Sequence, residues 1–152
     1  VKAFQDESYS ASILNILAIK FPDALLPNLL NQVQTFRNES CPPDIISSLV
    51  VKLPEWLLPD VLIVVREIQD DYSRAIVLST LADRLPDVLP EALETTKAIT
   101  DEYNRAYLLQ TLATKLPEIL LPDILQAVKA LSDEYYRACV LSFLTNNFPH
   151  IF

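Results

Sequence analysis

The sequence predicts an all-α protein, a right-handed α-solenoid of antiparallel helix pairs with about four and a half repeats and nine helices. Three observations predict it: an apolar residue followed by proline recurs every 31 or 32 residues, a second proline follows the first four pairs, and the chain contains no Gly. Fixed periods of about 20–50 residues are typical of helical repeats, and most tight β-hairpins need Gly. The two proline columns are Pro22, Pro54, Pro86, Pro117 and Pro149, and Pro27, Pro59, Pro90 and Pro122.

One repeat, residues 101–131, shows how each helix pair is specified. Thr100 is the expected N-cap of the first helix, and Asp101 and Glu102 then fill the first turn, where acidic side chains favour the helix dipole. Apolar residues follow at helical spacing, Lys115 lies in the last turn near the exposed carbonyls, and Pro117 ends the helix. A short link leads to the second helix, with Pro122 at its first position.

The same pattern predicts the other helices. We expect helices over 8–20, 27–36, 43–52, 59–69, 71–85, 90–99, 102–116, 122–131 and 134–147. A single pair cannot bury its own apolar faces, so neighbouring pairs are expected to stack into one domain over 1–152. Because the chain has no Met, we expect it to be a fragment of a longer protein.

Composition narrows the classes of partner. The net charge of −8 disfavours nucleic acid, whose phosphates require Lys and Arg. No apolar run approaches the length that spans a membrane, so we expect no membrane partner. Cys41 and Cys139 lie about three repeats apart, beyond the reach of a disulfide, which favours a cytoplasmic protein.

An acidic-Tyr-x-Arg-Ala motif opens three of the repeats. Each arginine follows an aspartate by four residues, which places both charges on one helix face. The motif predicts a structural ladder of charges and tyrosines along one edge, formed by Asp70, Arg74, Asp101, Arg105, Asp133 and Arg137 together with Tyr72, Tyr103 and Tyr135. The alternative is a row of arginines that grips an acidic peptide or a phosphate.

The sequence predicts no catalytic residues, no metal site and no cofactor. Paired carboxylates such as Asp101 and Glu102 resemble acid/base pairs or cation ligands, but their place at helix starts indicates capping. His150 is the only histidine, and without Gly no phosphate-binding loop can form. We therefore expect a protein that is not an enzyme.

Positions that vary between repeats are the candidate partner-binding sites, because stacking leaves them free to change. Ile76, Tyr107 and Phe143 are apolar at variable columns of the first helices, where a solvated residue is expected, and aromatic residues are enriched at interfaces. The variable column of the second helices contributes Arg66, Lys97 and Lys129. The alternative is that the apolar three only pad neighbouring helices. Trp56 is expected to fill the turn of its own repeat.

The repeats contain the sequence motif Asp-Glu-Tyr-x-Arg-Ala-x-x-Leu…Leu-Ala-x-x-Leu-Pro. This motif resembles that of known helical repeats, and the resemblance covers residues 6–149. In architecture the repeat resembles the HEAT and armadillo α-solenoids, with a shorter period. It is similar to short helical repeats in multidomain bacterial signalling proteins, cyanobacterial ones especially. There such arrays accompany nucleotide-binding switch ATPases, caspase-like proteases or β-propellers. The resemblance implies a sensing or autoinhibitory array.

The sequence thus predicts a non-catalytic protein–protein interaction module that binds a peptide segment or an adjacent domain of its parent chain. The alternative is a purely structural spacer or assembly element without a dedicated ligand. Apolar residues crowd both ends of the array, which predicts end-to-end self-association. In the last helix they are Val140, Leu141, Phe143, Leu144 and Phe148, with Ile151 and Phe152 beyond it, and in the first helix Ile13, Ile16, Leu17 and Ile19.

Overall fold

A computed structural model describes residues 43–151 of the chain. Its contacts divide the chain into two compact units, Val1–Gln69 and Asp70–Phe152, and each is described by itself. The helices expected over 8–20 and 27–36, and the apolar residues of the first helix, lie outside the described residues. The single domain over 1–152 stays a prediction. No helix of the described part is long and apolar enough to cross a bilayer.

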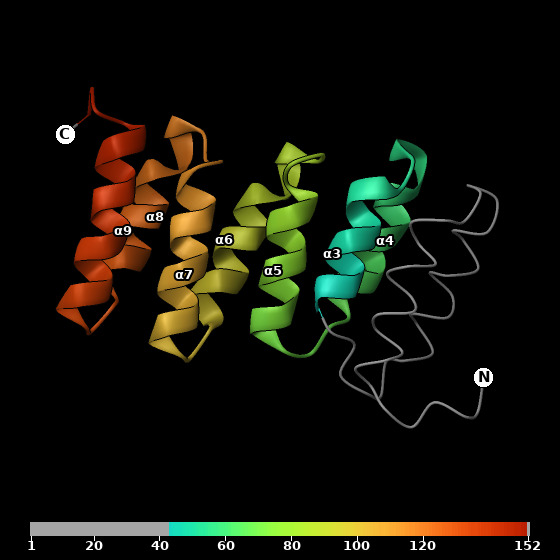
Figure 1. Ribbon diagram of the computed structural model, residues 1–152, viewed down its shortest axis with the longest axis horizontal. Helices are drawn as coiled ribbons and strands as arrows, with labels where there is room; N and C mark the ends of the chain where they lie inside the picture. Colours follow the sequence, from blue (N-terminus) through green and yellow to red (C-terminus); the bar gives the residue numbers. More distant parts are fainter. Residues whose placement is uncertain (1–42, 152) are drawn as a thin grey trace. The chain divides into compact units, whose positions relative to one another are not determined.

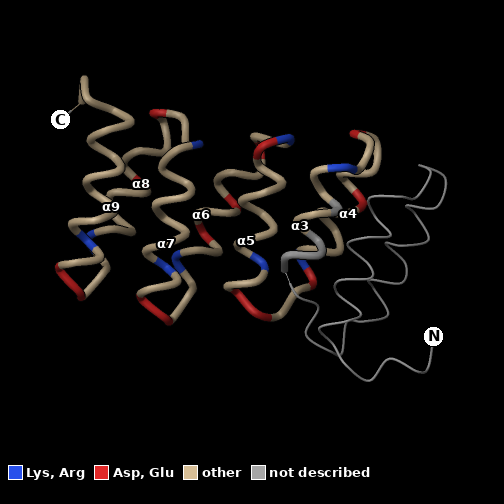
Figure 2. Tube along the Cα trace, viewed as in Figure 1, with Lys and Arg blue, Asp and Glu red and all other residues tan. Residues whose placement is uncertain are grey.

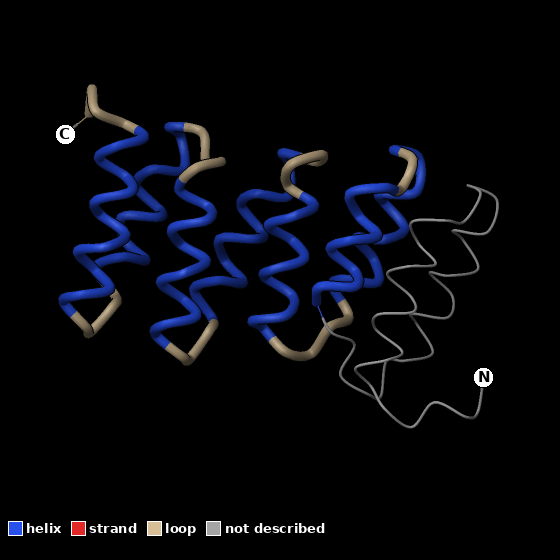
Figure 3. Tube along the Cα trace, viewed as in Figure 1, coloured by secondary structure: helices blue, strands red, loops and turns tan. Residues whose placement is uncertain are grey.

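The described part of the chain is all-α, as predicted. It contains seven α-helices and three short 3₁₀ helices, and Figure 3 shows no strand among the described residues. The α-helices are α3 (Pro43–Lys52), α4 (Leu58–Arg66), α5 (Asp71–Leu81), α6 (Leu89–Ala98), α7 (Glu102–Ala113), α8 (Leu121–Lys129) and α9 (Glu134–Asn147). The 3₁₀ helices are η3 (Glu55–Leu57), η4 (Pro86–Val88) and η5 (Glu118–Leu120).

Helices α5 and α7 end earlier than expected. The prediction carried them to residues 85 and 116, but they end at Leu81 and Ala113. Turns follow instead: the N–H of Arg84 donates to the carbonyl of Leu81, and that of Lys115 to the carbonyl of Leu112. The residue before a proline is disfavoured in the helical region, and the chain tightens into turns before it reaches the proline.

Each link between paired helices contains a 3₁₀ turn that the sequence pattern did not indicate. In each link the 3₁₀ helix leads straight into the next α-helix. The second-column prolines Pro59, Pro90 and Pro122 therefore stand at the second helical position, after a leucine, and not at the first. A proline there still costs no hydrogen bond, because the first N–H groups of a helix have no intrahelical acceptor.

Aspartates cap the helices that open the motif. The carboxylate of Asp70 accepts from the N–H of Ser73 at 2.7 Å, and that of Asp101 from the N–H of Asn104 at 2.8 Å. Asp133 caps α9 by accepting from the N–H of Tyr135 at 2.8 Å. The expected N-cap Thr100 is wrong, because Asp101 occupies that position with extended backbone and Glu102 begins the helix.

The unit Asp70–Phe152 contains two layers of helices. In Figure 1, α5, α7 and α9 lie in front and run in one direction, while α6 and α8 lie behind and run back. Helix α7 contacts α5 and α9 within its layer and α6 and α8 behind it. The buried side chains between the layers include Leu78, Leu81, Leu93, Leu109, Leu112, Ile124, Val128, Val140 and Leu144.

The described part of the unit Val1–Gln69 is a helix pair, α3 and α4, joined by η3. Leu53 and Leu57 of the link and Leu58, Val61 and Val65 of α4 are buried. Trp56 does not fill its turn, because 66 % of its surface is exposed.

More of the apolar surface of the last helix, α9, is buried than the sequence indicated. Val140, Leu144 and Phe148 are buried within the chain, against the expectation of an uncovered helix. Leu141 is half-buried, and Phe143 and Ile151 are exposed. Amphipathic packing on α7 and α8 provides this cover, so most of the apolar face of α9 is satisfied without a further partner.

Candidate functional site

The three motif arginines pair with carboxylates three residues before them. Arg105 contacts Glu102 at 3.3 Å and Arg137 contacts Glu134 at 3.6 Å. Arg74 pairs in the same way with Asp71. The carboxylates four residues before these arginines, those of Asp70, Asp101 and Asp133, accept from backbone N–H groups and cap their helices.

The same arginines also bind the backbone that leads into their helix. A guanidinium N–H of Arg105 donates to the carbonyl of Ile99, and one of Arg137 to the carbonyl of Leu131, both at 3.1 Å. Side-chain exposure is 16 % for Arg105 and 34 % for Arg137. These cations are engaged with the chain itself, which leaves little to support the alternative of an arginine row that grips an anion.

Glu102 connects the starts of α7 and α9. Its carboxylate oxygens accept from the backbone N–H of Ser132 at 2.8 Å and of Asp133 at 3.0 Å. These two hydrogen bonds, with a smaller contribution from the Arg105 cation, lower the pKa of Glu102 below its ordinary value of 4.5. Between the starts of α7 and α9 this contact runs from a carboxylate to backbone N–H groups.

Lys115 connects the ends of α5 and α7. Its ammonium donates to the carbonyl of Ser79 at 2.9 Å and forms an ion pair with Asp83 at 2.8 Å. The cation expected to serve the end of its own helix therefore serves the end of the neighbouring helix. At the corresponding place in α9, Asn147 donates instead to the carbonyl of Phe143 in its own helix.

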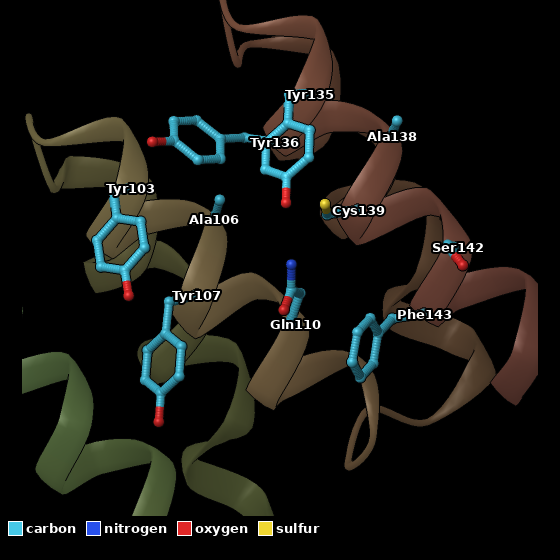
Figure 4. Close-up of a pocket in the computed structure, with 10 residues that line it drawn as sticks. All are labelled: Tyr103, Ala106, Tyr107, Gln110, Tyr135, Tyr136, Ala138, Cys139, Ser142 and Phe143. Carbon is cyan, nitrogen blue, oxygen red and sulfur yellow. The ribbon is translucent and has the colours of Figure 1, made fainter.

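A groove of about 540 Å³ lies between α7 and α9, on the unit Asp70–Phe152 (Figure 4). Its lining residues are Tyr103, Ala106, Tyr107 and Gln110 of α7 and Tyr135, Tyr136, Ala138, Cys139, Ser142 and Phe143 of α9. None of them carries a formal charge at neutral pH, and half are aromatic. Within each helix these residues recur at helical spacing and lie on one face. The face of α7 forms one wall of the groove and the face of α9 forms the other.

Three tyrosines cluster at one end of the groove. Tyr136 lies with its ring edge-to-face against both Tyr103, at 6.1 Å between ring centres, and Tyr135, at 5.7 Å. Tyr103 is 61 % exposed and Tyr135 is 71 % exposed. Edge-to-face stacking holds the rings in place while it leaves ring surface open to solvent.

The other end of the groove carries Tyr107 and Phe143, with Gln110 between them in Figure 4. Tyr107 is 53 % exposed and Phe143 is 43 % exposed. Half-exposed aromatic rings facing one hollow provide apolar contact area at small cost in side-chain entropy. The structure therefore brings together two of the six predicted partner-binding residues in one site.

A half-buried thiol lies along the wall of α9. In Figure 4 the hydroxyl of Tyr135 points toward the sulfur of Cys139. Their hydrogen bond raises the pKa of Tyr135 above its ordinary value of 10.0, so this hydroxyl stays protonated and can donate.

The four remaining candidates lie elsewhere. Ile76 is half-buried and packs against a cluster of Ala75, Ile99 and Leu108, as the padding alternative predicts. Lys97 pairs with Glu94 at 2.6 Å beside a second hollow of about 490 Å³ between α6 and α8. Lys129 is exposed at the end of α8, and Arg66 is exposed at the end of α4 in the other unit.

Tyr72 is the first tyrosine of the predicted ladder, and it does not contribute to the groove. It is half-buried against the same cluster as Ile76, whereas Tyr103 and Tyr135 are exposed and line the groove. The sequence reasoning missed Tyr136 and Gln110 as site residues. The signal was present, since residues three, four and seven positions apart on two helices of one layer form facing walls.

Among the described residues, no three His, Cys, Asp or Glu side chains lie together as metal ligands. His150 contacts Glu118 at 2.6 Å, thirty-two residues away in sequence, and both are mostly exposed. No family model matches the chain, and no curated protein or solved structure matches it.

Proposed function

We propose that this chain is a non-catalytic protein–protein interaction module, and that the groove between α7 and α9 is the surface that takes the partner. The observation that carries the proposal is the gathering of five aromatic rings around one uncharged hollow. Aromatic residues dominate the energetics of protein interfaces, and exposed apolar patches on soluble proteins usually have a binding role.

The proposal extends to the architecture. In the proposed form, the chain is a right-handed α-solenoid of nine helices and about four and a half helix pairs. The 32-residue sequence period supports this, as do contacts between segments about one period apart, such as Lys115 with Asp83 and Glu118 with His150. The resemblance to bacterial signalling arrays supports a sensing or autoinhibitory role in the cytoplasm, with a segment of the parent protein as partner.

Selection from a random-peptide display library tests the function. The bait is the chain, and the counter-bait is the double variant Tyr107→Ala, Phe143→Ala, which removes both rings at one end of the groove. We expect recovered peptides to bind the chain at least about tenfold more tightly than the double variant, as loss of two aromatic contacts implies. Circular dichroism confirms that the variant keeps its helices.

Ile119→Ala is the matched control, because Ile119 is 82 % exposed and lies outside the groove. Peptides that bind the chain should bind this variant equally well. Recovery of no peptide, or of peptides that bind the double variant as well as the chain, would favour a structural spacer or assembly element without a ligand.

A further inference from the structure

We propose that the groove between α7 and α9 binds an extended peptide that carries an arginine or lysine at its tyrosine end and an apolar side chain at its Tyr107–Phe143 end. The two side chains lie four residues apart. This inference rests on the proposed function and adds the chemistry and spacing of the partner.

The tyrosine end is suited to a cation. The rings of Tyr103, Tyr135 and Tyr136 are fixed edge-to-face, and two of them are more than half exposed. The face of an aromatic ring carries negative charge density and attracts ammonium and guanidinium groups. Arginine is favoured, because its planar group stacks on a ring while its N–H groups still reach a carboxylate.

Charge around this end favours the same partner. Helices α7 and α9 both begin with carboxylates, which Figure 2 shows in red at the start of each helix. Asp101, Asp133 and Glu134 are exposed, and the Glu134 side chain is 92 % exposed. Within residues 70–152, twelve Asp and Glu stand against seven Lys and Arg, a net charge of −5.

The cations near this end are turned away from the groove. Arg105 and Arg137 donate to the carbonyls of Ile99 and Leu131, and no Lys or Arg lines the groove. A cationic side chain on the rings therefore lies near the exposed carboxylates of Asp101, Asp133 and Glu134, whereas an anionic one is repelled by them.

The other end is suited to an apolar side chain. Tyr107 and Phe143 provide ring surface, and the Gln110 amide lies between them in Figure 4. An amide both donates and accepts hydrogen bonds, so Gln110 can pair with the backbone of an extended peptide that passes over it.

The spacing follows from helix geometry. Tyr135 and Phe143 are eight residues apart on α9, a rise of about 12 Å at roughly 1.5 Å per residue. An extended chain advances about 3.3 Å per residue and its alternate side chains share a face, so two side chains four residues apart span this length on one side. An α-helix about 10 Å wide does not enter a hollow of about 540 Å³ whose walls are two helices in contact.

Calorimetry with synthetic eight-residue peptides tests the inference. The probe has one arginine and one leucine separated by three residues, with Ser and Gly elsewhere and blocked ends. Matched peptides replace the arginine by citrulline or glutamate, or separate the pair by six residues. We expect the probe to bind about fivefold or more tightly than the citrulline peptide, with the difference reduced at high salt.

Variants of the chain locate the cation. Tyr135→Ala is expected to weaken the probe roughly threefold to thirtyfold, while Tyr135→Phe keeps the ring and changes little. Glu134→Gln should weaken the probe and flatten its salt dependence. Asp87→Asn removes an equal charge from η4, outside the groove, and should do neither.

Three results would overturn the inference. They are equal binding of the arginine and glutamate peptides, tighter binding of the peptide with the six-residue separation, and failure of every peptide in the panel. If the display library still yields peptides that depend on Tyr107 and Phe143, the proposed function stands and only the cationic motif is wrong.

Discussion

The carboxylate of Glu102 in α7 accepts a hydrogen bond of 2.8 Å from the backbone N–H of Ser132, the residue before the N-cap of α9. The next N–H, that of Asp133, donates to the same carboxylate at 3.0 Å. One side chain thus fixes the start of α9 relative to α7, and these two helices form the walls of the aromatic groove. The positions of the rings that face each other depend on this contact.

Removing this carboxylate should change the pH dependence of stability. Because the pKa of folded Glu102 lies below its ordinary 4.5, its stabilisation is complete above that pH and is lost as pH falls through the folded pKa. We expect Glu102→Gln to be less stable than the parent near pH 7 and to lose less further stability between about pH 5 and about pH 3. Urea unfolding at several pH values measures both effects.

Asp87→Asn provides the control, because this exposed carboxylate lies on η4 and no comparable contact across helices involves it among those described. Its pH profile should follow that of the parent. An unchanged slope for Glu102→Gln would show that the two backbone hydrogen bonds do not contribute to stability in solution.

Arg105→Ala should lower the free energy of unfolding by about 1–3 kcal/mol, because it removes a mostly buried guanidinium that donates to the Ile99 carbonyl and pairs with the Glu102 carboxylate. The stability of Arg105→Lys should lie between those of the parent and Arg105→Ala, since one ammonium cannot reproduce the two-pronged hydrogen bonding of the planar guanidinium. Arg137→Ala should cost less, because Arg137 is more exposed and its ion pair is longer. Equal losses at both positions would contradict this order.

The N-cap assignment is tested by neighbouring substitutions. Asp101→Ala should lower stability by about 1 kcal/mol, because it removes the acceptor for the N–H of Asn104. Thr100→Ala should change stability by less than about 0.5 kcal/mol, because Thr100 is an exposed residue outside the helix. Chemical denaturation of the two variants side by side makes the comparison, and a larger loss at Thr100 would restore the original prediction.

The ion pair between α5 and α7 can be rebuilt between α7 and α9. Thr114 and Asn147 occupy the sequence positions that correspond to Asp83 and Lys115, three and two residues before the following proline. We expect Thr114→Asp combined with Asn147→Lys to raise stability by about 0.5 kcal/mol, with a favourable coupling energy in a double-mutant cycle. Zero coupling would mean that the two helix contacts are not geometrically equivalent.

Much of the local structure follows from the sequence alone. The bounds of α3 and α9 agree residue for residue with the prediction, and the other helices are displaced by a few residues at one or both ends. Capping aspartates and prolines affect the backbone within one helical turn of their own position. Their effect on where a helix begins or ends can therefore be predicted without knowledge of the fold. The prediction of Thr100 as the N-cap in place of Asp101 was wrong, because both residue types are good N-caps. Only the backbone conformation shows that Asp101 is the last residue before the helix.

The candidate site was predicted only in part. Variable apolar positions pointed correctly to Tyr107 and Phe143 as exposed side chains, but they pointed equally to Ile76, which the contact between α5 and α7 half-buries. Sequence spacing put the motif arginines on one helix face with Asp101 and its equivalents. In the structure those aspartates cap their helices, and the arginines form ion pairs with the carboxylates three residues before them.

The sequence by itself determined the helices, their order and their apolar faces, because these depend on propensities and periodicities that act within a few residues. Tertiary structure alone decided that Glu102 reaches Ser132, that Lys115 serves the end of α5, and that Tyr103 and Tyr136 meet across a groove. These relationships join residues about thirty positions apart, and they depend on the rotation and offset of packed helices. Those quantities are set by how the side chains of the whole unit fill the space between its two layers.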